Sequence, residues 1–140
     1  MTRARGIRIP DELAHDIARE AEARGISWSA MTTTLLIEAL KMRRVPGIVM
    51  VDGPTGRRAV VAGSGLDVWE IIATWQACGH DEAQLAQHYP WLTQPQLRAA
   101  LAYYQLYPEE IEARLAREQQ WTPERVRREL PFAVPRHATS

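Results

Sequence analysis

Three arginines close to the start of the sequence are the residues best placed for chemistry. Arg3, Arg5 and Arg8 fall within residues 1–10, which contain no acidic side chain. A short basic segment on an otherwise neutral protein is typical of a contact with phosphate groups. The alternative is a solvated, frayed chain end. The charge of the segment is compatible with both a phosphate contact and a solvated chain end. The residues that follow the arginines distinguish these two interpretations.

Elsewhere the spacing of reactive residues argues against catalysis. The four histidines are scattered without the spacing of metal ligands. Cys78 is the only cysteine, which excludes an internal disulfide and a multi-cysteine metal cluster. The pairs Asp81-Glu82 and Glu109-Glu110 stand where helices are expected to begin, and carboxylates favour such positions because of the helix dipole. We therefore expect no enzyme, no metal site and no cofactor.

The composition is that of an ordinary soluble protein, with the length of one average domain or two very small ones. The 140 residues are 46% hydrophobic and 24% charged, and their net charge is zero. No apolar run approaches the roughly 18 residues that a membrane span requires. No apolar segment follows the basic start, as it would in a secretory signal. These features predict a cytoplasmic protein without a membrane contact.

A short strand and two helices are expected to position the arginines. Ile7 and Ile9 alternate with Gly6 and Arg8, as in a strand that Pro10 ends. Helices are expected over residues 11–24 and 27–44, and the second carries apolar residues on two faces. A unit of this size cannot bury so wide an apolar surface, and a lone strand leaves its edges unpaired. Two copies that pair their strands and interlock their helices would remove both defects.

Residues 46–107 predict a small module of a β-hairpin and three helices. Residues 48–51 and 57–61 flank a five-residue loop, Asp-Gly-Pro-Thr-Gly, which favours a hairpin. Apolar spacing and capping residues then predict helices that begin near Val68, Asp81 and Thr93.

The more polar residues 108–140 are expected to form a helical arm with little core of its own. Pro108 can start one helix, and Thr122-Pro123 repeats that start pattern. Aromatic anchors interleaved with arginines are typical of binding hot spots. The candidate contact residues of this arm are Trp121, Arg125, Arg127, Arg128, Phe132 and Arg136.

Residues 3–44 resemble the ribbon-helix-helix repressors. The resemblance rests on Arg-Gly-Ile-Arg-Ile-Pro-Asp-Glu-Leu at residues 5–13 and Gly-Ile-Ser-Trp-Ser-Ala-Met at residues 25–31. It implies a homodimer whose N-terminal strands form an antiparallel ribbon in the major groove of operator DNA. The implied DNA-binding residues are Arg8 at the base edges, Arg3 and Arg5 near phosphates, and Ser27 and Ser29 at the start of the second helix.

Residues 46–107 resemble a second family, DUF433, whose members are regarded as VapB-type antitoxin modules. The segments that carry the resemblance are residues 63–68, 77–80, 88–93 and 96–104. It implies a type II antitoxin that neutralises a PIN-like ribonuclease toxin, which holds Mg²⁺ with clustered carboxylates. An arginine of the arm could replace that cation, because a guanidinium binds carboxylates in bidentate geometry.

The predicted fold is mostly α with short β elements. A ribbon-helix-helix dimerisation domain (1–45) precedes a helix-turn-helix-like hairpin and three-helix module (46–107) and a helical toxin-binding arm (108–140). Because Arg98 is the one cation of the would-be recognition helix, this module favours protein contacts over a second DNA-reading role. The predicted function is an antitoxin that represses its own operon. The alternative is a stand-alone ribbon-helix-helix repressor whose second module dimerises or senses a ligand.

Overall fold

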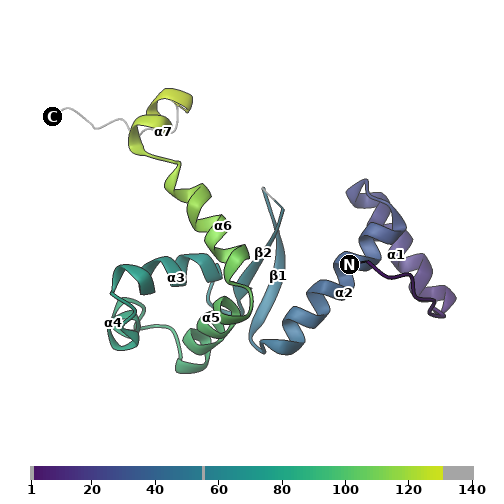
Figure 1. Cartoon of the computed structure of the whole chain (residues 1–140), viewed down its shortest axis with the longest axis horizontal. Helices are drawn as coiled ribbons and strands as arrows, with labels where there is room; N and C mark the ends of the chain where they lie inside the picture. The colour runs from purple at the N-terminus through teal and green to yellow at the C-terminus, as the bar shows by residue number, and fades with distance from the viewer. Residues whose placement is uncertain (1, 55, 131–140) are drawn as a thin grey trace. The chain divides into compact units, whose positions relative to one another are not determined.

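A computed structural model describes residues 2–54 and 56–130 and shows a mostly helical chain. Seven helices and one two-stranded antiparallel sheet lie within these residues (Figure 1). The predicted class, mostly α with short β elements, is confirmed. No helix in the described part of the chain is long and apolar enough to cross a bilayer. The chain forms two compact units, Met1–Arg44 and Val45–Ser140.

The first unit is a pair of helices, α1 (Asp11–Arg24) and α2 (Trp28–Arg44). Gly25 ends α1 in the left-handed conformation at φ 66°, which glycine adopts without steric cost. The Ser27 hydroxyl accepts a hydrogen bond from the Ala30 amide at 3.0 Å and so caps α2. The Trp28 indole N–H donates to the Ala14 carbonyl at 3.2 Å, which ties α2 to α1.

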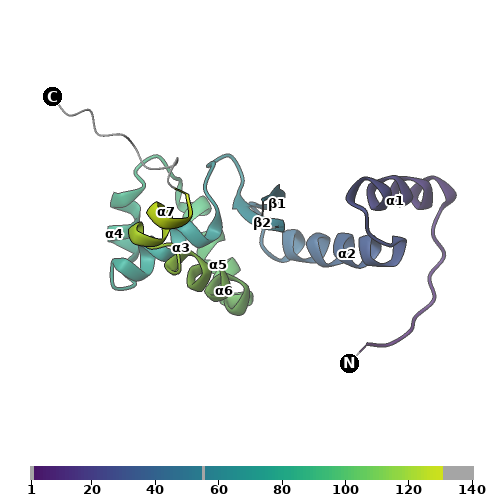
Figure 2. The same ribbon diagram turned by 90° about the horizontal axis from the view of Figure 1, so that it is seen from above.

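Residues 2–10 contain no strand in this single chain, although the alternation of Ile7 and Ile9 predicts one. The physical reason is that a strand needs a hydrogen-bonded neighbour, and the described part of the first unit has no other strand. The segment runs clear of both helices in Figure 2, and Ile7 is 70% exposed. Strand pairing therefore requires a second chain.

The second unit begins with a hairpin of β1 (Ile48–Gly53) and β2 (Gly56–Val61). The ladder runs from Ile48 opposite Val61 to Gly53 opposite Gly56. The predicted hairpin is thus confirmed, but the predicted five-residue loop is wrong. Pairing continues to both glycines, and only residues 54–55 connect the strands. Gly56 makes this tight connection possible, because its φ of 119° is closed to most side chains.

Five helices follow the hairpin, and local capping explains where most of them begin. They are α3 (Val68–Ala77), α4 (Glu82–His88), α5 (Gln94–Leu106), α6 (Pro108–Gln119) and α7 (Pro123–Glu129). Asp81 accepts hydrogen bonds from two amides at the start of α4. Thr93 and Gln96 form a reciprocal capping box at the start of α5. The predicted starts near these residues are confirmed.

One core joins the hairpin to α3, α4, α5 and α6. Its fully buried side chains include Val61, Ile71 and Tyr103. Helix α6 adds Ile111 and Leu115, which are 4% and 7% exposed. The expected separate arm therefore does not begin at Pro108, since the apolar face of α6 is buried in this core. Among the described residues after α6, none is buried.

Asp67 is a buried carboxylate that links the hairpin to the start of α3. It is 3% exposed, forms an ion pair with Arg58 on β2, and accepts a hydrogen bond from the Trp69 indole at 3.2 Å. Its backbone amide donates to Glu70 at 2.8 Å. A buried charge is stable only when it is paired and hydrogen-bonded, so this set of contacts fixes the register between strand and helix.

Asp67→Asn is expected to lower the free energy of unfolding by about 2 kcal/mol, because hydrogen bonds to a charged group are the strong ones. The matched control is Asp52→Asn. The Asp52 carboxylate pairs with Arg57 at 3.1 Å but is 66% exposed, so its loss should cost less than about 1 kcal/mol. Urea unfolding followed by circular dichroism measures both changes. Equal costs for the two variants would contradict the linking role of Asp67.

Candidate nucleic-acid and partner interfaces

The arginines of the N-terminal segment lie on the surface of the first unit. Arg3, Arg5 and Arg8 are exposed, and none forms an ion pair with any residue that the structure describes. Their guanidinium groups are therefore available to phosphates or base edges. In the single chain residues 2–10 form neither helix nor strand.

Ser27 and Ser29 lie together at the exposed start of α2, as the sequence predicts. The Ser27 hydroxyl is occupied as the cap of α2, whereas the Ser29 hydroxyl forms no hydrogen bond with a described residue. The first amides of a helix lack intrahelical partners and favour an anion. This end of α2 thus suits a phosphate contact.

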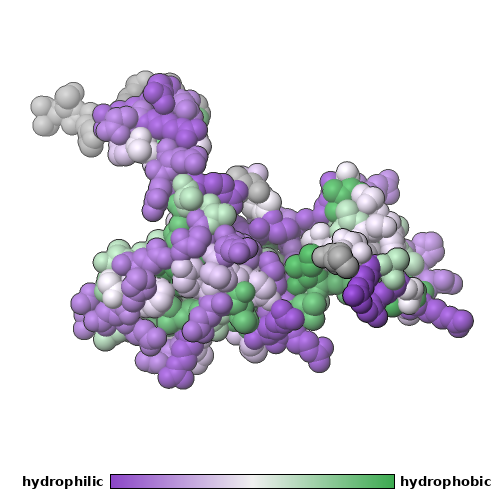
Figure 3. Space-filling model, viewed as in Figure 1, coloured by the Kyte–Doolittle hydropathy of each residue, from purple (hydrophilic) through white to green (hydrophobic). Residues whose placement is uncertain are grey.

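A wide apolar face of α2 is left uncovered in the single chain. The first unit buries only Ile17, Ala21 and Met31 as a core among its described residues. Leu36, Ile37 and Leu40 are 56%, 49% and 52% exposed, and hydrophobic surface over α2 is visible in Figure 3. Contiguous apolar surface of this kind marks an interaction site.

The surface of α5 offers little to nucleic acid. Leu97, Ala100 and Tyr103 are turned into the core, and Arg98 is the one cation of the helix. The turn between α4 and α5 instead exposes Trp91, which is 63% exposed and stacks edge-on against Tyr89 at 5.5 Å. An exposed aromatic ring beside a helix with a single charge suits a protein contact.

The predicted toxin-binding residues that the structure describes gather on and beside α7. Trp121 is 45% exposed, and the Arg125 guanidinium lies over its ring at 4.8 Å. Arg125 also pairs with Glu129 at 3.0 Å. Arg127 and Arg128 are exposed and pair with no described residue. The remaining two candidates, Phe132 and Arg136, lie outside the described residues.

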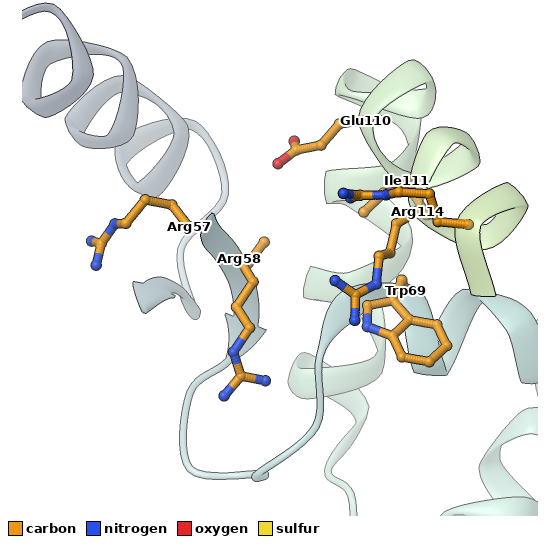
Figure 4. Close-up of a pocket in the computed structure, with 8 residues that line it drawn as sticks. Arg57, Arg58, Trp69, Glu110, Ile111 and Arg114 are labelled. Atoms are coloured by element: carbon orange, nitrogen blue, oxygen red, sulfur yellow. The ribbon is translucent and has the colours of Figure 1, made fainter. Parts of the chain in front are cut away.

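A pocket lined by arginines lies in the second unit, and the sequence analysis missed it. Arg57 and Arg58 of β2 form one wall, and Arg114 and Arg117 of α6 form the other. The Arg114 guanidinium lies over the Trp69 ring at 5.1 Å. Figure 4 shows the Arg114 guanidinium beside the Trp69 ring and the Arg58 side chain on the opposite wall. The sequence hints at this pocket only through two pairs of arginines. Arg57 and Arg58 are neighbours, and Arg114 and Arg117 are three residues apart, on one side of a helix.

A polar cluster on another face joins α3, α5 and α6. The Tyr104 hydroxyl donates a hydrogen bond to Glu112, and Gln76 donates to the same carboxylate at 3.1 Å. The bond to Glu112 raises the pKa of Tyr104 above its ordinary value, with burial and the Glu112 charge adding to the effect. These hydrogen bonds stabilise the packing of α3, α5 and α6.

Comparison with known proteins identifies the middle of the chain. Residues 48–104 match the model of a family described as a protein of unknown function, DUF433. No curated protein and no solved structure shows a significant match. The matched segment starts with β1 and ends inside α5, so it leaves out α6, which completes the same core. Residues 48–104 are therefore a DUF433 module, which follows an N-terminal helix pair and precedes a helix that packs into its core.

Proposed function

We propose that this protein is a non-enzymatic, dimeric DNA-binding regulator that acts as the antitoxin of a ribonuclease toxin and represses its own operon. The observation that carries the proposal is the first unit, in which an unpaired basic segment precedes two helices with an uncovered apolar face. A second copy would pair the segments as a two-stranded ribbon and cover that face. A paired ribbon is a known reader of the major groove.

The toxin-binding part of the proposal rests on α7 and the residues just before it. Trp121 offers an exposed aromatic anchor, and Arg127 and Arg128 offer two guanidinium groups that no described residue engages. A nuclease that holds Mg²⁺ with several carboxylates has a site that a guanidinium can occupy with bidentate geometry. One inserted arginine would exclude both the metal ion and the phosphate of the RNA.

Removal of residues 2–10 is expected to abolish operator binding, because these residues form the proposed ribbon. Within the ribbon, Arg8→Ala should cost about 1–3 kcal/mol and blunt sequence preference if Arg8 contacts a guanine edge. Arg3→Ala and Arg5→Ala should weaken binding evenly across sequences and flatten its salt dependence. Electrophoretic mobility shifts with the operator and a scrambled duplex measure both effects.

Arg98→Ala serves as the matched control, since Arg98 is an exposed arginine of the second unit. It should leave operator binding unchanged. If a chain without residues 2–10 still shifts the operator normally, the ribbon is not the DNA-binding element, and α5 takes its place as the candidate.

The second candidate function is a stand-alone repressor that senses a small ligand through its second unit. The arginine-lined pocket between β2 and α6 favours it, because it offers a ligand site within the unit that carries the DUF433 module. The two candidates share the DNA-binding dimer and differ in what the second unit and α7 bind.

A further inference from the structure

Trp28, the first residue of α2, is a surface tryptophan whose side chain reaches back to α1. It is 37% exposed, whereas the core residues of the first unit, Ile17, Ala21 and Met31, are at most 5% exposed. Its indole N–H donates to the Ala14 carbonyl at 3.2 Å. The side chain therefore links the two helices by a directed hydrogen bond at the surface rather than by filling the core.

The carbonyl that accepts this hydrogen bond belongs to the first turn of α1. Among the described residues of α1, the buried ones are Ile17 and Ala21, and the first turn, Asp11–Ala14, contributes none. A turn with few buried contacts opens or tilts at low cost in free energy. The Trp28 hydrogen bond therefore restrains the part of α1 that the core does not hold.

The basic segment of residues 2–10 joins the helix at this same turn. The Ala14 amide donates to the carbonyl of Pro10, the last residue of the segment, at 3.0 Å. Figure 2 shows residues 2–10 leaving the start of α1. The orientation of this turn consequently sets the direction in which the three arginines of the segment leave the unit.

The other end of the connection is fixed within α2. The Ser27 hydroxyl caps this helix, and the Trp28 carbonyl accepts a hydrogen bond from the Thr32 hydroxyl at 2.8 Å. The exposed apolar residues Leu36 and Leu40 lie further along the same helix. Because backbone hydrogen bonds hold the residues of a helix in fixed relative positions, a dimer that forms on this apolar face also fixes where the Trp28 side chain begins.

We propose that Trp28 is a positioning residue that aligns the basic segment with the dimer formed through α2. This inference rests on the proposed function, since only a dimer that reads DNA needs its two segments aligned. Two strands pair in a defined register when they approach each other from fixed directions. A ribbon that is already aligned binds duplex DNA more tightly, because binding then costs less conformational entropy.

Two substitutions separate the hydrogen bond from the aromatic packing. Trp28→Phe keeps an aromatic ring but removes the N–H donor. Trp28→His keeps a ring N–H at the place of the indole N–H, because the five-membered rings superpose, but removes the larger ring. At about pH 8 the imidazole is mostly neutral, so this change adds no charge. The matched control is Trp91→Phe, which makes the first change at a tryptophan of the second unit that is 63% exposed.

Mobility shifts compare the promoter region directly upstream of the gene for this chain with a scrambled duplex of the same length. We expect Trp28→Phe to bind the promoter duplex about fivefold more weakly than the wild-type chain, as for one net hydrogen bond. Trp28→His and Trp91→Phe should bind like the wild-type chain. All four chains should sediment as dimers.

Hydrogen exchange supplies a measurement that a general loss of stability would not reproduce. In the dimer, the amides of residues 2–9 should exchange faster in Trp28→Phe than in the wild-type chain and in Trp28→His, because strand pairing loosens. The amides of α2 should keep their rates. In the wild-type chain, the indole N–H of Trp28 should exchange more slowly than that of Trp91, and this comparison needs no variant.

Three results would overturn the positioning role. They are wild-type binding by Trp28→Phe, binding by Trp28→His that is as weak as that of Trp28→Phe or weaker, and equal exchange of the Trp28 and Trp91 indole N–H groups. Circular dichroism of each variant confirms that it is folded. A wild-type chain that binds the promoter duplex no better than the scrambled one would instead refute the proposed DNA binding, and the positioning role with it.

Discussion

Leu40→Asp is expected to convert the protein from a dimer into a folded monomer. In the single chain Leu40 is 52% exposed, so an aspartate there costs a monomer almost nothing. In the proposed dimer the apolar face of α2 is covered by the partner chain, and an unpaired buried charge costs several kcal/mol. Analytical ultracentrifugation should show the wild-type chain as a dimer at micromolar concentration and the variant as a monomer.

The matched control is Leu106→Asp, because Leu106 is also 52% exposed but ends α5 in the second unit. It should leave the dimer intact. Ile9→Asp and Leu35→Asp are expected to weaken the dimer through the ribbon and the helix face. A wild-type chain that sediments as a folded monomer at micromolar concentration would contradict the ribbon-helix-helix assignment.

A chain that ends at Gln120 is expected to lose its ability to silence the toxin while it keeps its fold and its operator binding. The truncation removes Trp121 and α7 but leaves the core intact, since the described residues after α6 include no buried side chain. Because the proposed inhibitory guanidinium groups lie on α7, inhibition should fall by orders of magnitude. Ribonuclease activity of the purified complex measures the loss.

Point variants of the full chain refine the same test. Arg127→Glu and Arg128→Glu should each release ribonuclease activity if that arginine enters the carboxylate cluster, because a carboxylate there adds like-charge repulsion. Arg98→Glu makes the same charge change on α5 and should release none. If the chain truncated at Gln120 still silences the toxin at stoichiometric amounts, inhibition resides in residues 46–107.

Elements defined by local interactions could be predicted from the sequence. Gly25 ends α1, and Asp81 and Thr93 cap α4 and α5, because capping needs only a few neighbouring residues. The excess apolar surface of α2 was also predictable, since it follows from counting apolar faces on a short unit. The five-residue hairpin loop was wrong because the sequence does not show that pairing extends to Gly53 and Gly56.

Features that depend on tertiary packing could not be predicted. The polar composition of residues 108–120 suggests a free arm, yet Ile111 and Leu115 complete the core because α3 presents an apolar surface to them. The arginine-lined pocket brings Arg58 and Arg114 together across the fold from positions far apart in the sequence. Helix and strand periodicity relate only residues within one element, so they cannot predict that Arg58 of β2 lies near Arg114 of α6.

Antitoxin and toxin genes of one operon lie side by side, so the proposed toxin is the product of the reading frame adjacent to the one that encodes this chain. The most direct test of the proposed antitoxin role is the ribonuclease activity of that product, measured alone and with this chain. We expect that product to degrade RNA in the presence of Mg²⁺, to copurify with the full chain, and to be silent in the stoichiometric complex. A product that lacks ribonuclease activity, or an active ribonuclease that neither copurifies with this chain nor is inhibited by it, would contradict the antitoxin role.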